Sequence, residues 1–150
     1  MTFFKQIKID NYSMIMEDVS KAVDSGDLSL SNIASSIFDK LSTNQPTLYS
    51  YLGSNKTAMH DLPIWLNHYR SGDFNEIHNY TSAEYKAKCT HTCILILDSG
   101  IDEYITVYVD ETPTTIRINA GDCFILENSV LHGLNTVKDR VIAIMVGILG

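Results

Sequence analysis

The sequence predicts a mainly β (α+β) chain: a small antiparallel jelly roll preceded by two or three helices. Its 150 residues, of which 45% are hydrophobic, suit one domain with a substantial core. Residues 10–60 show the apolar spacing of helices, whereas β-branched and aromatic residues dominate from residue 63 onward. We therefore expect a single domain over 1–150, with a helical part over 1–62 packed on a jelly-roll core over 63–150.

The helices of the first part follow from the spacing of its apolar residues. These residues recur every three or four positions over 14–23 and again over 30–41, which predicts two amphipathic helices. A third, shorter helix is expected over 47–52, between the chain break at Pro46 and the terminating Gly53.

The second part reads as a series of short strands. Each run of β-branched and aromatic residues ends at a turn rich in Gly, Asn or Asp. Strands are expected over 64–69, 90–97, 104–109, 114–118, 122–126 and 140–148. Short strands at regular spacing favour a sandwich or barrel over alternating strands and helices.

Charge and cysteine content exclude several classes of protein. The chain has 18 acidic and 11 basic side chains, for a formal net charge of -7. We expect no nucleic-acid partner and no membrane partner, because neutralising the phosphates of nucleic acid or of an anionic membrane needs clustered Lys and Arg. No segment approaches the ~20 apolar residues of a spanning helix, and the first residues do not form a signal peptide. Three cysteines, an odd count, indicate free thiols and a cytoplasmic protein. A homodimer through exposed sheet edges stays open.

Two stretches share one pattern, in which a glycine precedes a strand and a histidine follows where the strand meets a loop. The first stretch spans 72–84 and contains His78, and the second spans 121–132 and ends at His132. Together they resemble the two signature motifs of the cupin superfamily. Tyr80 stands where the cupin pattern has its second histidine.

The same stretches resemble the iron(II)- and 2-oxoglutarate-dependent oxygenases, which have the double-stranded β-helix fold. The resemblance spans roughly residues 63–148. It implies that His78 and His132 bind iron(II) and that Arg140 holds the distal carboxylate of 2-oxoglutarate. It also implies a protein that hydroxylates a small-molecule or peptide substrate of unknown identity.

A third metal ligand is less clearly marked. Non-haem iron(II) takes two imidazoles and one carboxylate on one face, with open positions for cosubstrate and oxygen. The oxygenase carboxylate falls at Tyr80 here. The cupin resemblance makes Glu84 the candidate third ligand, and Asp98, in a turn after a strand, is a poorer one. Tyr69, like Tyr80 and Tyr85, is expected to line the cofactor pocket.

Each candidate also has a purely structural interpretation. His78 can be a surface histidine at a strand end, and Glu84 can be a solvated residue in a polar loop. Arg140 can be a strand-end cation that faces solvent or pairs with a neighbouring carboxylate such as Asp139. Arg117 is then the reserve anchor for the cosubstrate.

A separate cluster of candidate ligands lies on the strand predicted over 90–97. Alternation places Cys89, His91 and Cys93 on one face, and zinc takes this mixture of ligands, with Cys123 as a fourth. Apolar residues continue the same face, so Cys93 can equally be a small core side chain.

Three functions therefore stay open, of which an iron(II)/2-oxoglutarate-dependent oxygenase is favoured. Tyr80 and the small size of the chain favour a non-enzymatic cupin-like module that binds a metal or another ligand. A jelly-roll scaffold or assembly protein is the third. Metal content separates the scaffold from the other two, and cosubstrate turnover separates the oxygenase from the binding module.

Overall fold

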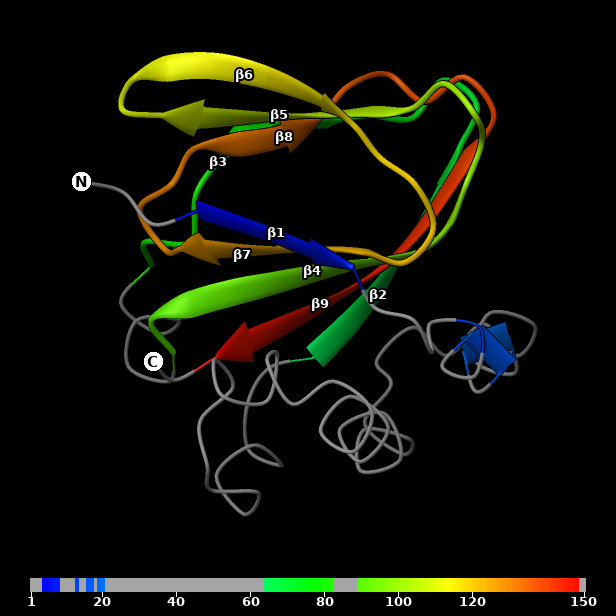
Figure 1. Cartoon of the computed structure of the whole chain (residues 1–150), viewed down its shortest axis with the longest axis horizontal. Coiled ribbons are helices and arrows are strands. Elements are labelled where there is room, and N and C mark those ends of the chain that lie inside the picture. The colour runs from blue at the N-terminus through cyan, green and yellow to red at the C-terminus, as the bar shows by residue number, and fades with distance from the viewer. Residues whose placement is uncertain are drawn as a thin grey trace.

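The computed structural model describes residues 4–8, 13, 16–17, 19–20, 64–82 and 89–148. The strands among these residues form two facing sheets. The strands are β1 (Phe4–Lys8), β2 (Ile64–Arg70), β3 (Asn75–His78), β4 (His91–Ser99), β5 (Tyr104–Val109), β6 (Thr112–Arg117), β7 (Asp122–Glu127), β8 (His132–Leu134) and β9 (Arg140–Ile148). One sheet has the order β1-β7-β4-β9-β2 and the other β3-β8-β5-β6, with antiparallel pairing throughout. The sheets close around a common interior (Figure 1), which confirms the predicted jelly roll of the double-stranded β-helix type.

All six predicted strands are present, and their ends differ from the prediction by two residues at most. The sequence did not predict β1, which lies in the part expected to be helical. This five-residue segment pairs along its whole length with β7. A strand this short carries little periodic signal, so its conformation depends on the tertiary contact.

The described helical residues are 13, 16–17 and 19–20, which lie in or beside the first predicted helix. Val19 is fully buried, and the Ser20 hydroxyl donates to the Met16 carbonyl oxygen, one turn earlier, at 2.9 Å. The predicted helices over 30–41 and 47–52 lie outside the described residues. In the part of the chain that the structure describes, no helix is long and apolar enough to cross a membrane.

The core between the sheets is built mainly from alternate residues of β4, β5, β7 and β9. Ile94 and Ile96 of β4 and Met145 of β9 pack in one cluster with Ile105 and Val107 of β5. The intervening residues of β4 and β9 project to the opposite face of the larger sheet and are also buried. This burial on both faces explains why β4 and β9 read as continuous apolar runs in the sequence.

The cysteines belong to this buried structure. Cys93 and Cys123 lie with their Sγ atoms 2.9 Å apart, and both thiols are free and fully buried. His91 directs its Nδ1 atom to the Thr90 hydroxyl, 2.8 Å away. Within the described ranges, no group of three or more His, Cys, Asp or Glu side chains is placed to hold a metal. The structure therefore supports the core interpretation of Cys93 and does not support the zinc patch.

Candidate functional site

Two histidines from neighbouring strands meet at one end of the interior. His78 ends β3, His132 begins β8, and the two residues pair directly in the antiparallel register. Their imidazole ring centres are 4.4 Å apart, with the ring planes inclined at 51°. The fold therefore brings together the two histidines that the sequence motifs singled out.

Gly133 allows β3 and β8 to approach this closely. A Cβ atom at this position would lie 2.7 Å from the carbonyl oxygen of Asn75 and 2.9 Å from Cδ1 of Ile77. Glycine within a strand often marks such a close approach of two backbones. Sequence reasoning missed Gly133, although an isolated glycine directly after His132 was an available signal.

Backbone hydrogen bonds determine which nitrogen of each imidazole is available. Nδ1 of His78 lies 2.7 Å from the Glu76 carbonyl oxygen, and Nδ1 of His132 lies 3.0 Å from that of Val130. A carbonyl oxygen can only accept, so each Nδ1 donates its proton, and in the neutral form of each ring the lone pair is on Nε2. Histidines that bind metals are commonly oriented by a hydrogen bond of this kind at the other ring nitrogen.

Burial keeps the His132 imidazole neutral. The residue is 3% exposed, and burial lowers the pKa of His132 to about 4, with a further decrease from nearby His78. Among the described residues, the buried Nε2 atom of His132 has no hydrogen-bond partner. A buried acceptor without a partner is energetically unfavourable, and a bound metal ion would satisfy it. A neutral imidazole is also the form that binds transition metals.

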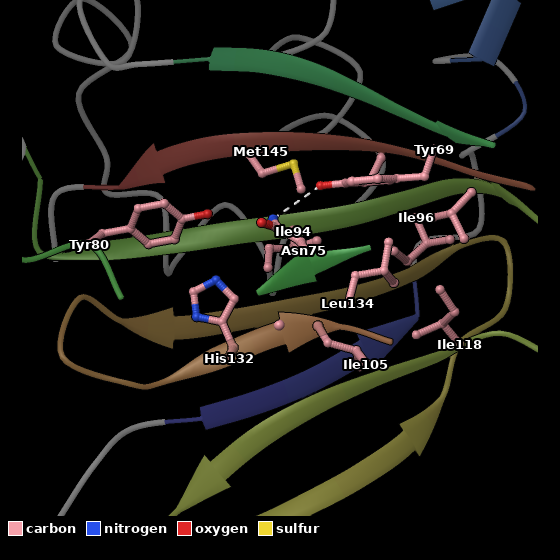
Figure 2. Close-up of a pocket in the computed structure, with 13 residues that line it drawn as sticks. Tyr69, Asn75, Tyr80, Ile94, Ile96, Ile105, Ile118, His132, Leu134 and Met145 are labelled. Atoms are coloured by element: carbon pink, nitrogen blue, oxygen red, sulfur yellow. Dashed lines mark hydrogen bonds between the residues drawn. The ribbon is translucent and has the colours of Figure 1, made fainter. Parts of the chain in front are cut away.

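A small apolar pocket lies between the sheets beside His132 (Figure 2). Its volume of about 30 Å³ has room for about two water molecules. Tyr80 stands next to His132 at one end and Tyr69 stands at the other, and both hydroxyl groups point into the pocket. The rest of the lining consists mainly of aliphatic side chains.

Tyr80 forms an aromatic cluster with the two histidines. Its ring centre lies 5.1 Å from that of His132 and 5.3 Å from that of His78. The Tyr80 backbone N–H donates to the Asn128 carbonyl oxygen at 2.9 Å, and the Asn128 side-chain amide donates to the Cys89 carbonyl at 2.7 Å. Burial raises the pKa of Tyr80 above its ordinary value, so its phenol is neutral before any ligand binds. Asn128 is a second site residue that sequence reasoning missed.

Tyr69 also lines this pocket, and its predicted role toward a cofactor stays a prediction. Its hydroxyl accepts a hydrogen bond from the side-chain amide of Asn75 at 3.3 Å. Burial raises the pKa of Tyr69 as well, so this phenol is also neutral.

No carboxylate joins the histidine pair within the described residues, since the metal-binding side chains there form no group of three. Glu84, the predicted third ligand, lies outside the described residues. Asp98, the poorer candidate, instead pairs with Arg140. The site shown by the structure therefore consists of two imidazoles and a phenol.

Arg140 lies apart from the histidines. Along β9, Val141 and Ala143 face the pocket, so alternation directs the Arg140 side chain elsewhere. Its Nε and Nη2 atoms donate to the two Asp98 carboxylate oxygens at 2.7 and 3.3 Å, and Nη1 contacts Asp139 at 2.7 Å. The structure thus shows the exposed strand-end ion pair and does not bring Arg140 to His78 and His132.

Solved structures with this fold include prolyl 4-hydroxylases. A prolyl-4-hydroxylase from Pseudomonas putida aligns over 99% of this chain and 88% of its own, with a TM-score of 0.66 and 10% identity. A prolyl 4-hydroxylase from Phytophthora capsici aligns over 98% of this chain and 59% of its own, with a TM-score of 0.64 and 14% identity. No protein-family model and no curated protein matches the sequence. At these identities the likeness establishes the fold alone, which is the one that these prolyl 4-hydroxylases share.

Proposed function

We propose that this chain is a metal-dependent oxidoreductase of the oxygenase type, in which His78 and His132 bind one iron(II) ion. The supporting observation is that both Nδ1 atoms donate to backbone carbonyl groups, so that Nε2 is the nitrogen left for a metal in each ring. Nε2 of His132 is also buried without a described hydrogen-bond partner. Two imidazole ligands from adjacent strands suit a non-haem iron site. The prolyl-hydroxylase fold is consistent with this chemistry.

The residues of the chain would prepare the site for the metal. The carbonyl groups of Glu76 and Val130 orient the two imidazoles, and the low pKa of His132 keeps that ligand unprotonated at neutral pH. Aliphatic side chains of the pocket limit access of water to the buried side of the pair. Iron(II) with open coordination positions supplies oxygen activation when it is bound.

The described residues fit the metal better than they fit 2-oxoglutarate. A dicarboxylic acid needs a cation for its distal carboxylate, and an arginine fork is well suited to this. No Lys or Arg is found among the described residues that line the pocket. Arg140 and Arg117 are exposed and pair with Asp98 and Asp102. We therefore assign no step to this cosubstrate. The binding of its distal carboxylate by Arg140 stays a prediction, and it would require the ion pair between Arg140 and Asp98 to open.

A non-enzymatic metal-binding module is the second candidate. The small volume of the pocket and its lack of a described cation favour this alternative. In such a protein the ion would join β3 to β8 and stabilise the fold, because an ion bound only by the native state adds to the free energy of unfolding.

Metal titration of the full chain tests the shared part of both candidates. Chelator-treated protein is titrated without oxygen against iron(II), with cobalt(II) as a spectroscopic substitute, and thermal unfolding is followed in parallel. We expect one ion per chain and a stabilisation of about 2.7 kcal/mol at free metal 100-fold above Kd. His78→Ala and His132→Ala should abolish binding, whereas the control Arg140→Ala should bind normally. Binding that survives loss of either histidine would refute the assignment.

Turnover then separates the two candidates. Iron-loaded protein is supplied with oxygen, with and without 2-oxoglutarate, and oxygen uptake and succinate are measured. Metal-dependent oxygen uptake that His132→Ala removes supports the oxidoreductase. Stoichiometric metal binding without oxygen uptake under either condition supports the binding module.

A further inference from the structure

Position 80 distinguishes this chain from the oxygenase pattern, because a phenol stands where that pattern has a carboxylate. The rings of His78, His132 and Tyr80 form a compact triangle with centre-to-centre distances of 4.4, 5.1 and 5.3 Å. Figure 2 shows the Tyr80 hydroxyl directed into the pocket beside His132. The phenol oxygen therefore shares its surroundings with the buried Nε2 lone pair of His132.

A deprotonated tyrosine can replace the missing carboxylate chemically. Both groups present one negative charge and one hard oxygen atom, and tyrosine serves as an iron ligand in catalase. The two anions differ in the oxidation state that they favour. The more basic phenolate, as a hard ligand, favours the harder ferric ion over the ferrous ion.

We propose that Tyr80 is the third protein ligand, so that His78, His132 and Tyr80 hold the iron and stabilise its ferric state more than a carboxylate ligand at this position would. This inference rests on the proposed function, since it requires the two histidines to bind the metal. On binding, the phenol O–H bond of Tyr80 breaks, its proton passes to the buffer, and an oxygen–iron bond forms. No electron is transferred, because the iron is supplied in the ferric state.

Tyr69 offers a matched comparison within the same pocket. It is a second inward-pointing phenol, but it stands at the end away from His132 (Figure 2). Its hydroxyl accepts a hydrogen bond from Asn75. Tyr108 offers a control outside this pocket, on the second half of β5.

The test is spectroscopic and does not depend on turnover. Chelator-treated full chain is loaded with iron(III), and the visible phenolate-to-iron(III) charge-transfer band is recorded with metal content and iron(III) affinity. We expect the band in the wild type and in the Tyr69→Phe and Tyr108→Phe variants. Tyr80→Phe should lose the band and bind iron(III) at least about tenfold more weakly. Loss of a residue that only hydrogen-bonds to a metal ligand typically weakens metal affinity about 10–100-fold, so loss of a ligand itself should have at least the smaller of these effects.

A second substitution keeps the proposal testable if Tyr80→Phe folds poorly. Tyr80→Asp restores a carboxylate and should bind cobalt(II) through an intact site while showing no charge-transfer band with iron(III). A wild type that binds metal without the band, or a band that persists in Tyr80→Phe or Tyr80→Asp, would overturn the role of Tyr80 and leave the histidine site standing. A wild type that binds neither cobalt(II) nor iron(III) would overturn the histidine site itself.

Discussion

Replacement of Glu103 by alanine is expected to destabilise the chain by about 3–5 kcal/mol. Glu103 is 2% exposed, and its carboxylate accepts hydrogen bonds from the backbone N–H groups of Lys138, Asp139 and Arg140 at 2.9, 2.9 and 3.2 Å. Hydrogen bonds to a charged acceptor contribute about 1.5–3 kcal/mol each. The full sum does not apply, because these three donor residues are exposed and water can replace part of the lost bonding. The bonds hold the segment that leads into β9, which supplies part of the pocket wall.

A graded pair of variants isolates this contribution. Glu103→Gln keeps one acceptor oxygen, which can still receive the Asp139 and Arg140 N–H groups, so we expect a loss of only about 1–2 kcal/mol. Urea-induced unfolding, followed by fluorescence of the single tryptophan Trp65, measures the free energy of unfolding of both variants. The dependence of this free energy on urea concentration should keep the wild-type slope. If the free energies of unfolding of both Glu103 variants lie within about 0.5 kcal/mol of the wild-type value, Glu103 does not hold this segment in place.

Two further predictions concern the histidine site. In the metal-free protein, the pKa of His132 is about 4 in the native state and near 6.5 in the unfolded state. Between these two pH values, the unfolded chain therefore takes up a proton at His132 that the native chain does not. The free energy of unfolding should therefore fall by up to about 3 kcal/mol as the pH drops from 6.5 to 4, and His132→Asn should lose this part of the dependence in a series of urea titrations. Gly133→Ala should destabilise the chain by about 1–3 kcal/mol and weaken metal binding, because its Cβ would displace Asn75 and Ile77 of β3. Unfolding and metal titration check both effects.

Each of these predictions has an outcome that contradicts it. Parallel pH profiles for the wild type and His132→Asn would mean that His132 does not titrate differently in the native and unfolded states. Unchanged stability and metal affinity in Gly133→Ala would mean that β3 and β8 do not need the close approach at this position.

Much of the fold can be predicted from local signals. Strand alternation and turn residues mark the six longer strands, because these patterns reflect burial and backbone geometry within a few residues. By contrast, β1 and β8 depend on pairing with segments distant in the sequence, and five or three residues carry too little pattern to reveal it. The same limit applies to Glu103, whose partners lie in another segment.

The candidate site divides in the same way. The sequence by itself determined that His78 and His132 each stand where a strand meets a loop, because motif spacing is a local property. Only the tertiary structure decided that these two rings lie together and that Tyr80 packs against them. It also decided that Arg140 pairs with Asp98 and does not face the pocket. The physical reason is register: a shift of one residue moves every side chain of a strand to its other face, and register depends on long-range pairing.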